Sequence, residues 1–249
     1  YLSNHRNSSN KLKDTHIKTS KIKAGIYIHI PFCRTKCMYC DFYSITDREK
    51  DADEFVSILC REILGSPLDE YPWTFDTLFI GGGTPSLLNE HQLESILTTL
   101  SKKVPFSNFV EKTVEINPGE ASLEKLTNFR SLGMNRVSMG VQSLEPKLLT
   151  FLTRFHSVKQ VFETCNHVRT AGFKNLNCDL IYGIPGQTPD IWKRDINRII
   201  ELSPEHISAY TLTVEKGTEL FHMVNSNDVT MPGEHISADW FNPTRSYLS

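Results

Sequence analysis

The chain has 249 residues, of which 39% are hydrophobic and 22% are charged. This size and composition are typical of a globular protein with one large core. The formal net charge of −2 argues against a broad attraction to nucleic acid or to an anionic membrane surface. No run in the sequence approaches the ~18 apolar residues of a membrane span.

The first 23 residues are polar and carry six Lys or Arg residues against one acid, Asp14. A basic, serine-containing, acid-poor leader is typical of a mitochondrial presequence, whereas a plain disordered tail would have a similar composition. Both interpretations stay open for residues 1–23. The predicted location is the mitochondrion, with the cytoplasm as the alternative.

From residue 24 onward the sequence alternates between strand and helix patterns. The expected strands are residues 25–30, 76–81, 112–117, 136–141, 176–182 and 206–212. The expected helices are residues 48–65, 90–102, 122–132, 145–153, 157–171 and 189–201. This alternation predicts an α/β fold of right-handed βαβ units. Six strands suit a partial (β/α)6 TIM-like barrel over residues 24–220, with function at the C-terminal strand ends. A doubly wound open sheet is the alternative.

Several of these strands have one aliphatic face and one face with polar groups. Ile26, Ile28 and Ile30 share a face of the first strand, opposite Tyr27 and His29. By the same period of two, polar faces carry Glu115, Gln142 and Asp179. Polar groups inside a barrel are costly unless they are hydrogen-bonded, which predicts a large polar ligand in the lumen. Buried water or a self-paired network is the alternative.

Three cysteines follow the first expected strand in a C-x3-C-x2-C spacing, at Cys33, Cys37 and Cys40. Pro31 ends the strand, because proline cannot donate to a ladder. Three thiolates on one tight loop can converge on a soft metal centre. Structural zinc would need a fourth ligand, and the sequence shows no second Cys or His pair for it. A [4Fe-4S] cluster on three cysteines leaves one iron open to a cofactor.

The other cysteines are Cys60, Cys165 and Cys178, which are scattered along the chain and are expected to be small core residues. No disulfide framework is predicted, which indicates a reducing compartment. After the second expected strand, Gly81-Gly82-Gly83-Thr84-Pro85 lacks the Lys-Ser/Thr ending of a phosphate loop. Its glycines allow the backbone to approach a ligand closely.

The cysteine spacing and its flanks, Tyr27-Ile-His-Ile-Pro-Phe-Cys33 and Tyr39-Cys40-Asp41-Phe42, resemble the radical S-adenosylmethionine (radical SAM) superfamily. Within it they resemble the oxygen-independent coproporphyrinogen III oxidase-like family and its heme-chaperone branch. The resemblance implies that the three cysteines hold a [4Fe-4S] cluster, and that SAM is cleaved reductively with the help of an electron donor protein. The SAM-binding residues that it implies are Tyr27, Tyr39, Gly82, Gly83, Thr84, Glu115, Gln142, Arg154 and Asp179.

Phe42 stands where the oxidases of this family carry a fourth cysteine, C-x3-C-x2-C-x-C. Phenylalanine at this position resembles the heme-chaperone branch, which binds heme and delivers it to apo-cytochromes. We therefore expect a heme-handling chaperone. The alternatives are oxidative decarboxylation of coproporphyrinogen III to protoporphyrinogen IX, and an inactive truncated form.

The resemblance extends over residues 24–240. The family continues into a second domain with a His-Asn-x-x-Tyr-Trp heme motif, and the sequence contains no His-Asn pair. Residues 221–249 are accordingly expected to be the start of a truncated C-terminal region, and heme binding by this chain is expected to be weak.

Overall fold

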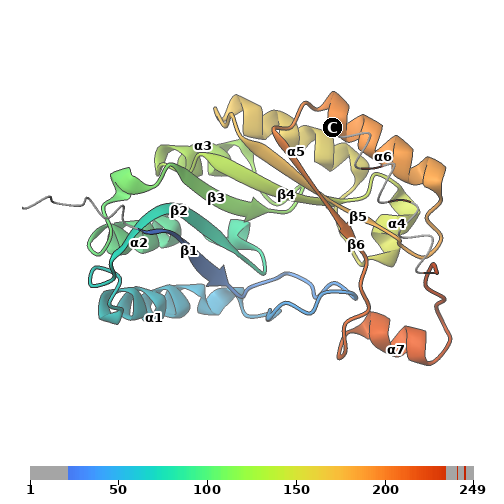
Figure 1. The fold of residues 1–249 in the computed structure, drawn as a ribbon, viewed down its shortest axis with the longest axis horizontal. Helices are drawn as coiled ribbons and strands as arrows, with labels where there is room; N and C mark the ends of the chain where they lie inside the picture. Colours follow the sequence, from blue (N-terminus) through green and yellow to red (C-terminus); the bar gives the residue numbers. More distant parts are fainter. Residues whose placement is uncertain (1–21, 234–239, 241–243, 245–249) are drawn as a thin grey trace, which may run out of the picture.

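The computed structural model describes residues 22–233 together with Trp240 and Thr244. Within this part of the chain, the strands form one parallel sheet in the order β1-β2-β3-β4-β5-β6 (Figure 1). They are β1 (Ile22–Ile30), β2 (Trp73–Gly82), β3 (Glu111–Ile116), β4 (Arg136–Gln142), β5 (Leu176–Tyr182) and β6 (His206–Thr211). The sheet curls into a half-barrel with β1 and β6 as its edges, which confirms the predicted partial (β/α)6 barrel. The sequential strand order excludes a doubly wound sheet, whose order reverses at a switch point.

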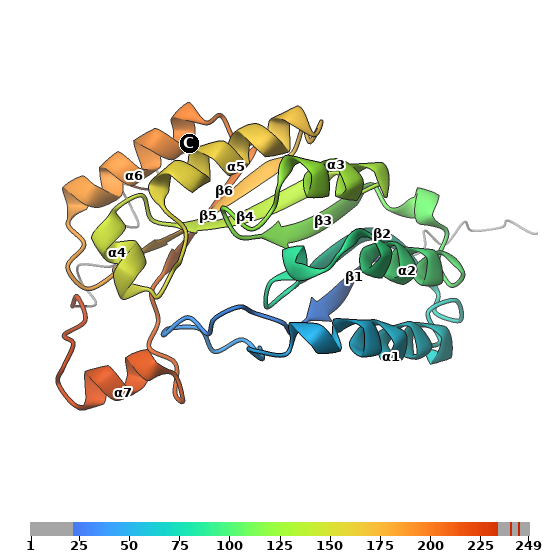
Figure 2. The ribbon, with the colours of Figure 1, turned by 180° about the vertical axis from the view of Figure 1, so that it is seen from behind.

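The connecting helices follow the outer side of the curled sheet in both views (Figures 1 and 2). The helices are α1 (Ala52–Gly65), α2 (Glu90–Ser101), α3 (Leu123–Ser131), α4 (Pro146–Phe151), α5 (Val158–Thr170), α6 (Pro189–Glu201) and α7 (Glu219–Asn225). Short 3-10 helices lie at Glu49–Asp51, Pro85–Leu87 and Phe106–Asn108. One large apolar cluster fills the space between the sheet and the outer helices.

The alternation of side chains along the strands decides which face is buried. Ile28, Ile30, Val114 and Ile116 are buried in the core between the sheet and the helices. Tyr27, on the opposite face of β1, is 56% exposed, because the lumen is open. The predicted division into an aliphatic outer face and a polar inner face is therefore confirmed in β1 and β3.

Several helices begin at a side chain that caps the free backbone N–H groups of the first turn. Asn89 and Gln92 form a reciprocal capping box at the start of α2, and Ser157 and Gln160 form another at the start of α5. Thr188 caps α6, which begins with a proline. These caps fix where each βα loop ends, and the loops carry the candidate site.

Two differences concern the ends of the predicted half-barrel domain. β1 begins at Ile22, which pairs with Trp73, so the strand includes the last two residues of the expected leader. The rest of the leader lies outside the described residues. α7 was not expected, and the predicted boundary between residues 220 and 221 falls inside it. Within the described residues, no helix is both long and apolar enough to cross a membrane.

Candidate functional site

The loop between β1 and α1 carries the cysteine motif and folds back on itself. Phe32 and Ile45 form a parallel bridge across it. The backbone N–H of Cys33 donates to the carbonyl oxygen of Ile45 at 2.9 Å, and Ile45 N–H donates to Pro31 O at 2.8 Å. This bridge joins the two ends of the loop, so that its central residues protrude from the C-terminal edge of the sheet.

Lys36, inside the cysteine motif, stabilises the loop through two further hydrogen bonds. Its Nζ donates to Phe42 O at 2.6 Å and to Ser44 Oγ at 2.8 Å. At the far tip of the loop, Met38 belongs to a second apolar cluster, and its carbonyl oxygen accepts a hydrogen bond from Leu220 N–H of α7 at 2.9 Å. α7 and this loop lie side by side in both ribbon views (Figures 1 and 2). The loop is thus held at its base, in its middle and at its tip.

Cys33, Cys37 and Cys40 are free, half-buried thiols on this loop. Burial raises the pKa values of Cys33 and Cys40, and the neighbouring cysteines raise them further, which indicates that the sulfurs lie near one another. No three His, Cys, Asp or Glu side chains among the described residues gather tightly enough to ligate a single metal ion. A [4Fe-4S] cluster makes a different demand, because each thiolate binds a separate iron atom. Three soft thiols of this kind on one braced loop fit such a cluster.

The glycine turn after β2 packs directly on the start of the cysteine loop. Gly83 N–H donates to Ile30 O and Thr84 N–H donates to Phe32 O, both at 2.7 Å. A Cβ atom added at Gly83 would lie 2.6 Å from Phe32 O, which is a backbone atom that cannot move aside. Glycine is therefore required here for the close approach of two backbones.

Glu115 on β3 faces the same turn. Its Oε2 accepts a hydrogen bond from Gly82 N–H at 3.0 Å. Gly82 has a φ of +113°, and an added Cβ would lie 2.6 Å from the His29 ring. Burial raises the pKa of Glu115 to about 7; the Gly82 N–H opposes this rise and Asp179 adds to it. A desolvated carboxyl group of this kind is a good partner for a cationic ligand group.

Arg154 lies in the loop between α4 and α5. Its Nη2 donates to Gly140 O at 2.8 Å and also to Asn117 Oδ1, while Nη1 lies 3.7 Å from Cys37 Sγ. Burial raises the pKa of Tyr39, whose phenol lies next to this guanidinium. Arg154 therefore connects the cysteine loop to the ends of β3 and β4.

Asn117 received no role from the sequence, although it shares the polar face of β3 with Glu115. Its Nδ2 donates to Thr84 Oγ1 at 3.2 Å, and Thr84 Oγ1 in turn donates to Cys33 Sγ at 3.6 Å. Together with the Arg154 contact, this makes Asn117 the side chain that joins the glycine turn to the arginine. The signal that could have identified Asn117 as a site residue is its spacing of two residues from Glu115, which places both side chains on the same face.

Gln142 was predicted to face the lumen because of strict alternation along β4. The structure has a register shift between Gly140 and Gln142, and Gln142 adopts a φ of +66°. A Cβ added at Gly140 would nevertheless lie 3.0 Å from Gln142 Nε2, so the amide lies beside the site. The amide thus lies on the expected side of β4. Its orientation results from a β-bulge at which Gln142 adopts a left-handed backbone conformation, and not from the regular alternation of side chains along the strand.

Asp179 on β5 accepts hydrogen bonds from Asn177 Nδ2 at 2.7 Å and from Ser138 Oγ at 3.0 Å. Burial raises the pKa of Asp179, and these donors oppose the rise.

Tyr27 lies on the opposite side of the half-barrel, where its phenol forms a hydrogen bond with His29 Nδ1 at 3.2 Å and its ring stacks on Phe79. Phe42 and Tyr43, near the end of the cysteine loop, are 65% and 71% exposed.

A parallel half-barrel whose first loop presents three thiols beside a glycine turn, with acids and an arginine facing the lumen, is the architecture of a protein that binds a [4Fe-4S] cluster and SAM. The chain belongs to the Radical SAM superfamily, which its sequence matches over residues 27–199. Membership of this superfamily implies SAM and an iron–sulfur cluster as cofactors.

The sequence is similar to several curated relatives. It is 36% identical over 216 residues to the heme chaperone HemW of Bacillus subtilis, a match that covers 86% of this chain and 57% of the relative. It is 32% identical over 222 residues to radical S-adenosyl methionine domain-containing protein 1, mitochondrial, of Danio rerio, with coverage of 89% and 50%. The chain therefore spans about half the length of the curated relatives it matches.

Among solved structures, the fold is similar to coproporphyrinogen III oxidase (HemN) from Escherichia coli, described as a radical SAM enzyme. The TM-score is 0.79 at 28% sequence identity, and the match covers 92% of this chain and 52% of that one. The family predicted from the cysteine motif is confirmed.

Proposed function

We propose that this chain is the radical SAM core of a heme chaperone, which binds heme and delivers it to apo-cytochromes. The observation that carries the proposal is the cysteine loop: three thiols at Cys33, Cys37 and Cys40, with Phe42 in the position where oxidases of the family carry a fourth. The similarity to proteins named heme chaperones supports it.

We assign the cluster to these three cysteines and SAM to the lumen at the C-terminal strand ends. When bound, the two cofactors supply the one-electron cleavage of SAM that the superfamily uses. Glu115 is suited to accept hydrogen bonds from the ammonium group of SAM, and Arg154 is suited to hold its carboxylate. Asp179 can accept hydrogen bonds from hydroxyl groups. The assignment is supported by the shared placement of these side chains around the glycine turn and the lumen.

The second candidate is oxidative decarboxylation of coproporphyrinogen III, which the similarity to coproporphyrinogen III oxidase favours. Phe42 argues against it, because the benzyl side chain adds no thiol beside the cluster. The other cysteines of the described residues, Cys60, Cys165 and Cys178, lie in α1, α5 and β5 and not on the cysteine loop.

The two functions are separated by an anaerobic assay with reconstituted protein, SAM, a chemical reductant and coproporphyrinogen III. The chaperone proposal expects no vinyl porphyrin product, whereas multiple turnovers would favour the oxidase. In parallel, heme titration of this chain is compared with that of the Bacillus subtilis relative, which is longer. We expect weaker heme binding by this chain; equal and tight binding by both would place the heme site in the half-barrel.

For the cellular setting, we propose a mitochondrial protein with an electron donor protein as a partner. The mitochondrial relative from Danio rerio and the six basic residues before residue 24 support this location. A fusion of residues 1–23 to a fluorescent protein tests it, and diffuse cytoplasmic fluorescence would favour the alternative.

A further inference from the structure

The lumen contains a side-chain network centred on a residue that the proposed SAM site does not use. Asn177 lies on β5 two residues before Asp179, so both side chains point to the same face of the sheet. Asn177 is 2% exposed. Its Nδ2 donates to Asp179 Oδ1 at 2.7 Å and to Ser138 Oγ at 2.8 Å, and Ser138 Oγ donates to Asp179 Oδ2 at 3.0 Å. Each oxygen of the Asp179 carboxylate therefore has a fixed donor.

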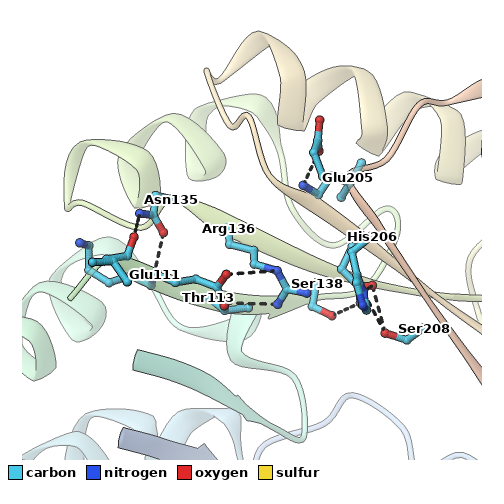
Figure 3. Close-up of polar contacts among 12 residues, drawn as sticks. Glu111, Thr113, Asn135, Arg136, Ser138, Glu205, His206 and Ser208 are labelled. Carbon is cyan, nitrogen blue, oxygen red and sulfur yellow. Dashed lines mark hydrogen bonds and ion pairs between the residues drawn. The ribbon is translucent and has the colours of Figure 1, made fainter. Parts of the chain in front are cut away.

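The other end of the Asn177 amide is anchored on β6. Its Oδ1 accepts hydrogen bonds from His206 Nδ1 at 2.5 Å and from Ser208 Oγ at 3.0 Å. Figure 3 shows Ser138, His206 and Ser208 converging on this point from strands on either side of β5. The amide orientation follows from chemistry, because the NH2 group must face the carboxylate and the oxygen must then face His206, which carries its proton on Nδ1.

All the hydrogen-bonding capacity of the Asn177 side chain is thus used, with two donated and two accepted bonds. A buried amide satisfied in this way has a single orientation, because rotation would break bonds at both ends. The strand register places Asn177 beside Ser138 and His206, whereas Asp179 lies beside Gly140 and Ser208, nearer the C-terminal ends. The amide therefore contacts the carboxylate from the N-terminal side of β5.

We propose that Asn177 is a positioning residue which, together with Ser138, holds the Asp179 carboxylate as a two-oxygen acceptor for ligand hydroxyl groups in the lumen. This inference rests on the proposed SAM site and extends it by the residues that orient one of its acids. These bonds also explain why position 177 carries an asparagine and not an aspartate. A carboxylate at position 177 could not donate a hydrogen bond to Asp179, and its negative charge would repel the Asp179 carboxylate.

The charges around Asp179 determine what a substitution would do. Glu115 on β3 is an acid facing the same lumen, and Arg136 on β4 is a cation whose charge lowers the pKa of Asp179. On β6, a hydrogen bond from Ser208 also lowers the pKa of Asp179, whereas His206 bonds to Asn177. Tyr27 and His29 face the lumen from β1. Replacing the Asn177 amide by a carboxylate removes a donor and adds a like charge, so the pKa of Asp179 should rise.

The test compares Asn177→Asp with wild-type protein, using anaerobically reconstituted chain and SAM binding measured by calorimetry between pH 5.5 and 8.5. We expect Asn177→Asp to weaken SAM binding about tenfold or more at neutral pH, as loss of a charged hydrogen bond does. In a plot of SAM affinity against pH, the pH at which affinity is lost on acidification should also be higher in the variant, by about one pH unit. A purely structural role would lower stability without changing that pH.

Asn135→Asp is the matched control. This amide joins β4 to β3 by accepting from Lys112 N–H and donating to Val110 O (Figure 3). The hydrogen bonds of Asp179 come from other residues, Ser138 and Asn177. Its SAM affinity and pH profile should equal those of the wild type. If Asn177→Asp does not fold, Ser138→Ala removes one donor to the same carboxylate and should show a smaller loss of affinity, with a shift to higher pH as well.

Two kinds of failure are distinguishable. Wild-type protein that does not bind SAM, or Asp179→Ala protein that binds it normally, refutes the proposed SAM site and this inference with it. Loss of binding in Asp179→Ala, with unchanged affinity and pH profile in both Asn177→Asp and Ser138→Ala, refutes the positioning role alone. Equal effects of Asn177→Asp and Asn135→Asp would also refute it.

Discussion

The pKa of Glu115 predicts how the stability of this protein depends on pH. Burial holds the group at about 7 in the folded chain, compared with its usual 4.5. The folded state therefore binds this proton more tightly than the unfolded state does. Below about pH 4.5 the group is neutral in both states and costs nothing. As pH rises from 4.5 to 7 the unfolded state gains its charge first, so the free energy of unfolding decreases, and above about 7 the loss is constant.

The magnitude follows from the two pKa values. One pKa unit corresponds to ~1.4 kcal/mol, so the rise from 4.5 to about 7 costs the folded state about 3 kcal/mol at pH 8. Glu115→Gln removes the charge and keeps an oxygen that can accept from Gly82 N–H. We expect the variant to equal the wild type at pH 4.5 and to be more stable by about 3 kcal/mol at pH 8. Urea unfolding followed by circular dichroism at several pH values measures this difference.

Glu205 supplies a control of opposite sign. Although burial opposes it, hydrogen bonds from Arg169 and Leu176 N–H lower the pKa of this surface carboxyl group. Its ionised form is therefore favoured by folding, and the contribution is lost as pH falls through the folded pKa. Glu205→Gln should be less stable than the wild type above pH 4.5, and the difference should shrink on acidification. A pH-independent difference for Glu115→Gln would show that Glu115 is solvated like a surface acid and would refute the reasoning.

Three further predictions concern the cofactor site. Anaerobic reconstitution should give about four irons per chain and Cys37→Ala should lose most of them, as measured by iron and sulfide analysis; one tightly bound zinc instead would contradict the cluster assignment. Gly83→Ala should lower both cluster content and thermal stability, because its Cβ would lie 2.6 Å from Phe32 O, and unchanged values in both assays would show that the turn can relax. Arg154→Ala should weaken SAM binding roughly ten- to a hundred-fold by calorimetry, through loss of a charged hydrogen bond, whereas wild-type affinity in this variant would exclude Arg154 from the site.

The regular strands could be predicted from the sequence because their aliphatic residues repeat every second position. Residues 176–182 were expected as a strand and form β5 with the same ends. β2 was predicted too short, since it begins at Trp73 and not at residue 76. The register of β1 and β2 shifts between Ala24 and Gly25, and both Phe75 and Leu78 are buried, which breaks the period of two.

The site depends on contacts that a local pattern does not contain. Arg154 reaches Cys37 because the loop between α4 and α5 folds back over the strand ends, and sequence spacing gives no measure of that. The left-handed conformation of Gln142 is likewise set by the bulge in β4. α7 is held by contacts with Met38, which is far from it in the sequence. The short sequence of α7 by itself therefore did not indicate a helix.

The bridge between Phe32 and Ile45 has a consequence for binding of the cluster that we propose for this loop. Ordering a loop costs about 1–2 kcal/mol per residue in conformational entropy. Here the backbone bonds at Cys33 and Ile45, together with Lys36 and the Leu220 contact at Met38, order much of the loop as the protein folds. The apo-protein thus offers the arriving iron and sulfide a preorganised receptor, and little of the binding free energy is spent on arranging the ligands. Such a loop allows the cofactor to bind after the chain has folded, without further ordering of the loop backbone.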